Sequence, residues 1–219
     1  MSKVATRSAD RQWYIVGRWQ EFGGEARANF VRIAAVAVFY SLQLVHFHLL
    51  APADQRDVAF HRGATVLAVA GVFAALAVQL CLQRRVFPAS LKYLSTALDV
   101  ALISGLAALG DGAHSPMRLA LFLVIALAAL RFSLGLVWCT TLATMLSYLG
   151  LVGWSDAVWF DADHSVRPIE QLVTLASLAL TGIVMGQVIR QVRLMAEEYD
   201  RRLRGATSEA DAAVPKGIA

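Results

Sequence analysis

Long apolar stretches alternate with short charged segments along this chain. The stretches cover residues 33–50, 63–82, 91–109, 119–130, 134–154 and 172–189. A helix needs about 20 mostly apolar residues to cross the hydrocarbon core of a bilayer. Most of the stretches approach that length, and 119–130 reaches it only with its flanking residues. The pattern predicts an all-α polytopic membrane protein, built as a bundle of six transmembrane helices.

The distribution of Lys and Arg predicts the orientation of these helices. Basic residues gather before the first stretch, in the second and fourth connections and after the sixth stretch, whereas the other connections carry mainly Asp and Glu. Basic residues are enriched in the cytoplasmic loops of membrane proteins. We therefore expect both termini in the cytoplasm, an arrangement that requires an even number of spans.

The composition argues against a soluble domain. The chain is 58% hydrophobic and only 16% charged, against about 25% charged residues in an ordinary soluble domain. Its formal net charge is +4, but the basic residues flank the apolar stretches, so they predict contact with anionic lipids and not with nucleic acid. No segment outside the stretches is long enough to bury a catalytic core of its own.

The same pattern divides the chain into four segments. Residues 1–30 form an expected cytoplasmic N-terminal segment, 31–190 the six-helix transmembrane domain, 191–204 a cytoplasmic helical extension and 205–219 a disordered tail. The tail is assigned from its small and polar residues, which cannot bury enough apolar surface to fold.

An amphipathic pattern precedes the first stretch. Trp13, Val16, Trp19 and Phe22 recur every three or four residues. This spacing predicts an interfacial helix whose tryptophans lie at headgroup depth. A helix packed on the cytoplasmic loops of its own bundle would have the same period. Trp13 and Trp19 are candidate contacts to a partner.

A second apolar line crosses from the last stretch into the charged segment that follows. Met185, Val188, Val192, Met195 and Tyr199 are spaced by three and four residues. This short heptad pattern predicts a helix that leaves the membrane and pairs with a second copy of the chain or with another protein. A solvated helix end, stabilised by ion pairs along its own surface, is the alternative.

Gly182 and Gly186 form a GxxxG pattern within the sixth stretch. Small residues at this spacing allow another helix to approach closely. We favour packing inside the bundle, and a contact between two chains is the alternative.

Asp99 lies near the middle of the third stretch. An unpaired ionised carboxylate at that depth costs at least about 2.5 kcal/mol. It therefore has to be protonated, paired or directed into a polar cavity. Hydrogen bonding that only supports packing, ligand binding, and proton or ion conduction are three open interpretations. The candidate packing partners are Ser95, Thr96, Ser104, Thr140, Thr141 and Thr144.

His46 and His61 are weak candidates for a metal or haem site, because imidazole is a common ligand and both flank apolar stretches on the predicted outer side. The chain has neither the Cys-x-x-Cys-His nor the His-Glu-x-x-His motif. It also has no nucleophile elbow and no phosphate-binding loop. We expect no cofactor and no enzymatic activity of the chain alone.

The chain resembles the six-helix membrane sensor or anchor region at the N-terminus of bacterial signalling proteins, which include membrane-bound adenylate/guanylate cyclases, diguanylate cyclases and histidine kinases. The residues that carry the resemblance are Arg18–Glu21 and Glu25–Asn29 before the first stretch, Phe60–Thr65 entering the second, Asp99, Ser115–Pro116 before the fourth and Leu130–Phe132 ending it. In such proteins the last membrane helix continues into a catalytic output domain, whereas this chain ends where that domain would begin.

The resemblance implies a location in the bacterial cytoplasmic membrane and a stand-alone module. Our leading hypothesis is a non-catalytic scaffold or sensor-like module that acts through contacts with other integral membrane proteins, for instance as an accessory subunit of a larger complex or as a homodimer. A small-molecule transporter or ligand-binding protein centred on Asp99 is the second hypothesis. A haem- or metal-bearing electron-transfer subunit is the third.

Overall fold

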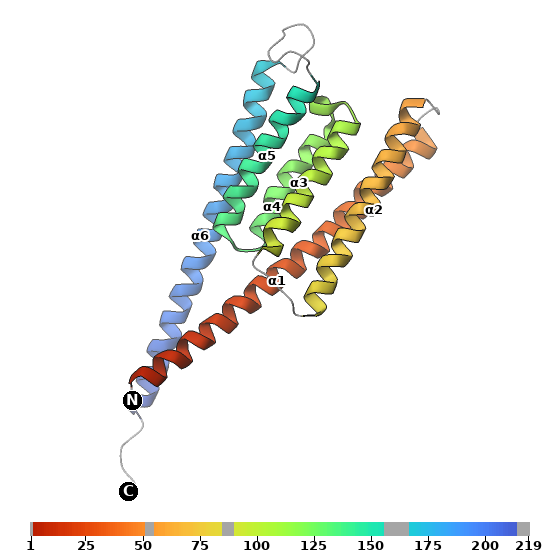
Figure 1. Cartoon of the computed structure of the whole chain (residues 1–219). Coiled ribbons are helices and arrows are strands. Elements are labelled where there is room, and N and C mark those ends of the chain that lie inside the picture. Colours follow the sequence, from red (N-terminus) through yellow and green to blue (C-terminus); the bar gives the residue numbers. More distant parts are fainter. Residues whose placement is uncertain (1, 51–54, 85–89, 156–166, 214–219) are drawn as a thin grey trace.

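The fold is a bundle of long helices (Figure 1). The computed structural model describes residues 2–50, 55–84, 90–155 and 167–213, with side chains described for 22–49, 58–84, 90–155, 167–199 and 201–202. The α-helices are α1 (Ser2–Val45), α2 (Gln55–Gln83), α3 (Leu91–Leu109), α4 (Ala120–Ala129), α5 (Leu134–Ser155) and α6 (Pro168–Ala213). A π-helical turn, η1 (His46–Leu50), ends α1, and two 3₁₀ turns, η2 (Gly112–His114) and η3 (Pro116–Leu119), precede α4. The described residues contain no strand, which confirms the all-α class.

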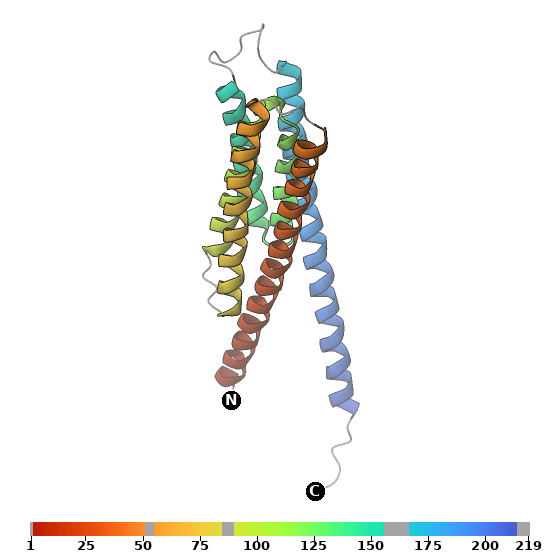
Figure 2. The same cartoon turned by 90° about the vertical axis from the view of Figure 1, so that its right-hand side faces the viewer.

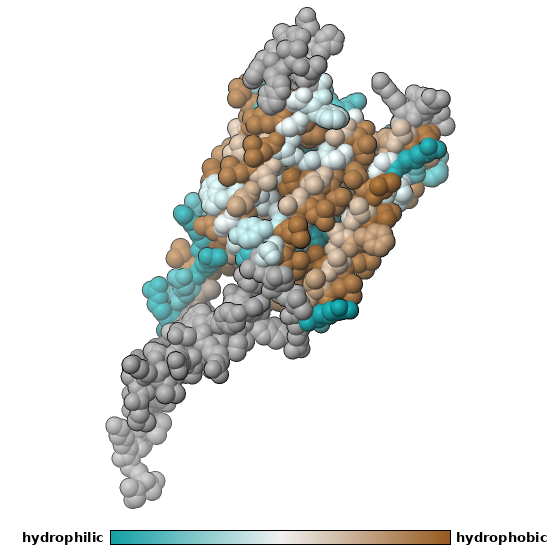
Figure 3. Space-filling view, viewed as in Figure 1, coloured by the Kyte–Doolittle hydropathy of each residue, from teal (hydrophilic) through white to brown (hydrophobic). Residues whose placement is uncertain are grey.

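Within the described residues, five helices are long and apolar enough to cross a membrane. These segments are Phe22–Leu49, Val58–Gln83, Leu91–Leu109, Leu134–Ser155 and Pro168–Tyr199. Their outward-facing side chains are largely apolar, and Figure 3 shows a predominantly brown surface along the bundle. Large contiguous apolar surfaces of this kind are rare on soluble monomers. The arrangement is that of a multi-pass membrane protein.

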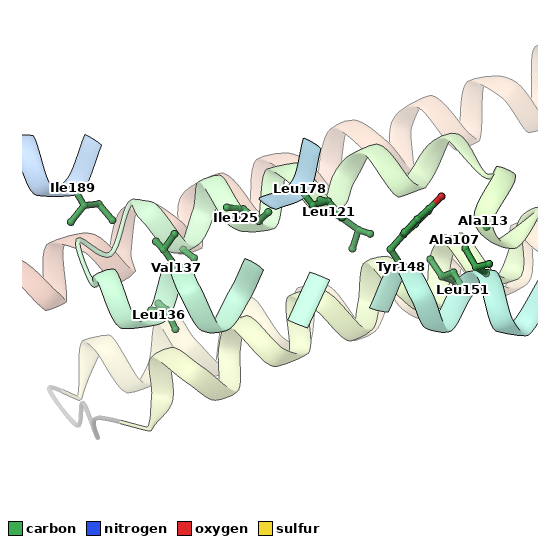
Figure 4. Packing of buried hydrophobic residues seen from close by; sticks show 12 residues of the cluster. Ala107, Ala113, Leu121, Ile125, Leu136, Val137, Tyr148, Leu151, Leu178 and Ile189 are labelled. Atoms are coloured by element: carbon green, nitrogen blue, oxygen red, sulfur yellow. The ribbon is translucent and has the colours of Figure 1, made fainter. Parts of the chain in front are cut away.

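The shorter apolar segment Pro116–Ala129 is the fourth predicted stretch. Within it, α4 is apolar on every side, and a helix with that pattern is usually enclosed by others. Its fully buried residues share one side of the helix: Ala120, Leu121, Val124, Ile125, Leu127 and Ala128. The remaining residues of α4 are half-buried, so none of its side chains is fully exposed. Side chains from α3, α4, α5 and α6 meet around it in the main hydrophobic cluster (Figure 4). This cluster forms the centre of the bundle.

The segment predicted to form an interfacial helix is continuous with the helix of the first apolar stretch. Trp13 and Trp19 belong to α1, which runs without a break from Ser2 to Val45. No proline interrupts this sequence, so nothing forces a bend. The predicted boundary between residues 30 and 31 therefore falls inside one helix.

The C-terminal helix is longer than the sequence indicated. We expected the helix to stop at residue 204, but α6 continues to Ala213. Residues 205–213 contain four alanines and one glutamate, which are good helix formers, and only one glycine. The first proline after the sixth stretch is Pro215, and it is the residue that cannot continue a helix.

Gly182 and Gly186 face α5 of the same chain. A Cβ atom at Gly182 would lie 2.7 Å from Cγ2 and 2.9 Å from Cβ of Thr141, and one at Gly186 would lie 3.3 Å from Cδ1 of Leu134. Both glycines are buried. The small-residue pattern thus serves packing inside the bundle, as favoured from the sequence.

We expect Gly182→Ala to destabilise the protein by about 1 to 3 kcal/mol, because Thr141 is buried and cannot move aside freely. The matched control is Gly150→Ala on α5, where an added Cβ meets no atom within 4 Å. The control should be neutral or stabilising, since alanine favours a helix over glycine. Thermal unfolding in one detergent measures both, and equal shifts for the two variants would contradict the close α5–α6 contact.

Candidate functional site

Asp99 is paired with an arginine across the bundle. Nε of Arg32 donates to Oδ1 of Asp99 at 2.6 Å, and Nη2 donates to Oδ2 at 2.8 Å. The two side chains are 6% and 7% exposed. Such a two-point contact matches the planar guanidinium to the carboxylate and fixes its orientation. The pair joins α1 to α3.

Three polar residues on one face of α1 build its side of the site. Glu25, Asn29 and Arg32 are separated by four and three residues, so they project from the same side of the helix. All three are buried. Asn29 accepts a hydrogen bond from Nη1 of Arg32 at 2.9 Å and donates to the carbonyl of Ala75 on α2 at 3.2 Å. The polar face of α1 therefore reaches both α2 and α3.

A second buried ion pair joins the same face of α1 to the connection between α4 and α5. Nε of Arg131 lies 2.7 Å from Oε2 of Glu25, and Nη2 donates to Oε1 at 2.9 Å. Arg131 also donates to the carbonyl of Lys92 at 3.0 Å, to Oγ of Ser95 at 3.0 Å and to the hydroxyl of Thr96. The guanidinium of Arg131 thus contacts both α1 and α3.

Gly24 permits that close approach. A Cβ atom at this position would lie 2.9 Å from the carbonyl oxygen of Leu130 and 3.0 Å from Cα of Arg131. Both are backbone atoms, which cannot yield as a flexible side chain can. A glycine next to Glu25 is thus what lets α1 contact the end of α4.

The two pairs form one electrostatically balanced cluster, which we call the buried charge cluster: Glu25, Asn29, Arg32, Ser95, Thr96, Asp99 and Arg131. Each carboxylate has an arginine partner and the formal charges cancel. Removing two charges from water is costly, and only good geometry with additional hydrogen bonds offsets that cost. The serine, threonine and asparagine contacts supply such bonds.

A cavity adjoins the Arg32–Asp99 pair. It has a volume of about 110 Å³, is partly open to the surroundings and lies between α1, α2, α3 and α4. Apolar side chains form most of its wall, among them Val36, Phe39, Leu67, Ala68, Leu102 and Leu127. Arg32 and Asp99 form a charged part of the cavity wall. Tyr40 and Gln43 contribute polar groups to the wall farther along α1. It is a place where a small apolar molecule could be held beside a polar pair.

The sequence pointed to the importance of Asp99 but to the wrong partners. Thr140, Thr141 and Thr144 donate to backbone carbonyls of their own helix. Ser104 contacts the hydroxyl of Ser147 on α5. Ser95 and Thr96 bind Arg131. The partner of Asp99 is instead Arg32, one of the basic residues that precede the first apolar stretch.

In the described part of the chain, His46 and His61 belong to no group of residues that could hold a metal ion. The ring of His61 stacks on that of Phe47, with centroids 4.2 Å apart and planes at 8°. The nearest histidine ring with a described contact is that of His48, at 6.2 Å. His46 is exposed. Among the described residues, no three His, Cys, Asp or Glu side chains are placed to hold a metal ion.

The remaining candidate contacts lie on α6 and α1. Val188 and Val192 are 47% and 42% exposed, and Met195 and Tyr199 are 70% and 65% exposed. This apolar line, which we call the α6 seam, thus has little cover from its own chain. The side chains of Trp13 and Trp19 lie outside the described residues.

Comparisons with known proteins give no further guide. No protein-family model matches the chain, and neither a curated protein nor a solved structure matches it. The interpretation of the site therefore depends on its own geometry.

Proposed function

We propose that the protein is a non-catalytic, sensor-like membrane module that acts through contacts with other integral membrane proteins. The observation that supports this best is the exposed apolar seam on the C-terminal part of α6, which continues beyond α2, α3, α4 and α5, as the N-terminal part of α1 also does (Figures 1 and 2). Apolar residues at heptad spacing on a projecting helix are suited to pairing with another helix. A location in the bacterial cytoplasmic membrane, with both termini on the cytoplasmic side, belongs to the same proposal.

The connection between α4 and α5 offers a route from the buried charge cluster to α6. Arg131 lies in this connection and binds Glu25. The carbonyl of the next residue, Phe132, accepts a hydrogen bond from Arg193 of α6 at 2.6 Å. A change in the cluster would thus reach the base of the α6 seam through two adjacent residues. This is the behaviour expected of a module that couples its membrane part to a partner.

Charged side chains on the C-terminal part of α6 pair with one another, so the α6 seam remains free to contact a partner. Glu198 accepts from Nε of Arg202 at 3.0 Å, and both side chains are exposed. Such a pair along one helix contributes only a few tenths of a kcal/mol. The Glu198–Arg202 ion pair stabilises α6 itself. The apolar side chains of the α6 seam make no such contact, and their burial against another helix would be favourable.

The test is photo-crosslinking in the native membrane. We expect a photoreactive phenylalanine at Met195 or Tyr199 to give a discrete adduct, whose partner is then identified by mass spectrometry. The same residue at Leu194 or Glu197, which are equally exposed neighbours off the seam, should give at least several-fold less adduct. An adduct with a second copy of the chain would specify a homodimer. Equal yields at all four positions would contradict a specific contact along the seam.

A further inference from the structure

We propose that the cavity beside the Arg32–Asp99 pair binds a neutral amphiphile, a molecule with one apolar chain and one head group that both donates and accepts hydrogen bonds. A long-chain alcohol is the simplest member of this class. The inference rests on the cavity and its polar groups, and it does not depend on the proposed contacts of α6.

The apolar lining of the cavity indicates that the ligand has an apolar chain. The cavity lies on the inner side of the α1–α2 hairpin, which Figure 1 shows leaning away from the other helices toward the end where α1 passes to α2. Its wall is mainly aliphatic and aromatic. Along α1 the lining runs from Arg32 to Gln43, eleven residues or about 16 Å. A volume of about 110 Å³ over such a length suits a single narrow chain rather than a bulky ring system.

The free hydrogen-bond donors of Arg32 and free lone pairs of Asp99 indicate which kind of head group the cavity would bind. Arg32 has five N–H donors. Two donate to Asp99 and one to Asn29, which leaves one on each terminal nitrogen. Each oxygen of Asp99 accepts one bond from Arg32 and has a second lone pair. A hydroxyl or amide can use both a free donor and a free lone pair without separating the ions.

The balance of charge argues for a neutral head. Arg32 and Asp99 cancel, and the surrounding walls are apolar. A carboxylate would compete with Asp99 for Arg32, and an ammonium would compete with Arg32 for Asp99. Either would leave a net charge in a poorly solvated place, which is costly. The same pair thus attracts a neutral polar group and disfavours charged amphiphiles.

The experiment uses the full chain in phosphatidylcholine vesicles and a twelve-carbon alcohol that carries a diazirine in its chain. We expect saturable photolabelling of cavity residues on α1, α2 and α3, located by mass spectrometry of peptides. Probes of the same chain length with a carboxylate or a trimethylammonium head should label these residues about tenfold less, as expected for about 1.4 kcal/mol of discrimination.

Two variants of α2 form a matched pair. Ala68 lines the cavity, whereas Ala70 on the same helix is exposed on the bundle surface. Ala68→Phe should lower saturable labelling about tenfold, because the added ring occupies the space that the ligand chain would fill, and tenfold corresponds to about 1.4 kcal/mol of binding free energy. Ala70→Phe should leave labelling unchanged. If Ala68→Phe does not fold, Ala64→Leu fills the same cavity with a smaller side chain.

Competition distinguishes the two sources of such a ligand. Displacement of the probe by dodecanol alone indicates a diffusible molecule, and displacement by diacylglycerol indicates a lipid of the bilayer. Either supports the proposal. Unsaturable labelling, equal labelling in both variants or equal labelling by charged probes would overturn it.

Discussion

Replacing Asp99 with alanine is expected to lower the free energy of unfolding by about 3 to 5 kcal/mol, the usual cost of removing one partner from a buried ion pair. The loss arises because Arg32 would keep its charge in a place that is 5% exposed, with only Asn29 left as a described hydrogen-bond partner. Denaturation by increasing SDS, or thermal unfolding in one detergent, measures the change.

The double variant Arg32→Met with Asp99→Leu tests the cause of that loss. Side chains of similar volume without charge often match or exceed the stability of a buried ion pair. We therefore expect the double variant to recover most of the stability lost by Asp99→Ala. Asp111→Ala serves as the control, because Asp111 is exposed just beyond α3 and a change there should stay within about 0.5 kcal/mol. A loss at Asp99 no larger than at Asp111 would contradict the pairing.

Asp99→Asn separates packing from transport. The amide keeps the shape of the carboxylate but leaves Arg32 without a counter-charge, so the paired arrangement predicts a loss of stability. Transport centred on Asp99 predicts a different result, in which solute uptake stops while the amount of folded protein is unchanged.

Where a stretch is mostly apolar and bounded by polar residues, the sequence placed the helices closely. The predicted stretch 91–109 coincides with α3, and 134–154 ends one residue before α5 does. These boundaries were accessible because a helix surrounded by lipid or by other apolar helices must itself be predominantly apolar over its length. Hydropathy is then sufficient to find both ends.

The beginning of the first span could not be found in this way. Hydropathy placed it at residue 33, because Glu25, Asn29 and Arg32 are polar, yet all three are buried among other helices. Whether a charge faces water or an opposite charge depends on residues far along the chain: Asp99 lies 67 positions from Arg32, and Arg131 lies 106 from Glu25. The one available signal was their spacing of four and three, which puts them on one face of a helix.

The predicted partners of Asp99 were wrong for the same reason, because its true partner lies far away along the chain. Nearby serines and threonines were plausible, since such side chains often bond carboxyl groups between membrane helices. In the structure most of them satisfy a carbonyl one turn earlier in their own helix. Arg32 is one of the basic residues before the first stretch, and the positive-inside rule explains a basic residue there equally well. Only the three-dimensional arrangement distinguishes a basic residue that flanks a span from one that pairs with a buried carboxylate.

Arg131 is expected to be the second position with a large effect. Arg131→Ala should cost about 3 to 5 kcal/mol, because Glu25 is 0% exposed and would be left as an uncompensated carboxylate. Hydrogen exchange should also become faster in α1 around Glu25, since this contact holds α1 to the end of α4.

Arg131→Lys shows whether geometry or charge alone holds this contact. Arg131 uses all three guanidinium nitrogens to reach Glu25, Lys92, Ser95 and Thr96. A lysine keeps the charge but presents one compact ammonium, which cannot span these acceptors. We expect a loss of about 2 to 3 kcal/mol, comparable to one or two charge-assisted hydrogen bonds. The matched control is Arg190→Lys on α6, where the side chain is exposed and the change should stay within about 0.5 kcal/mol. If the two lysine variants unfold alike, charge alone holds α1 in place and the hydrogen-bond geometry of Arg131 contributes little.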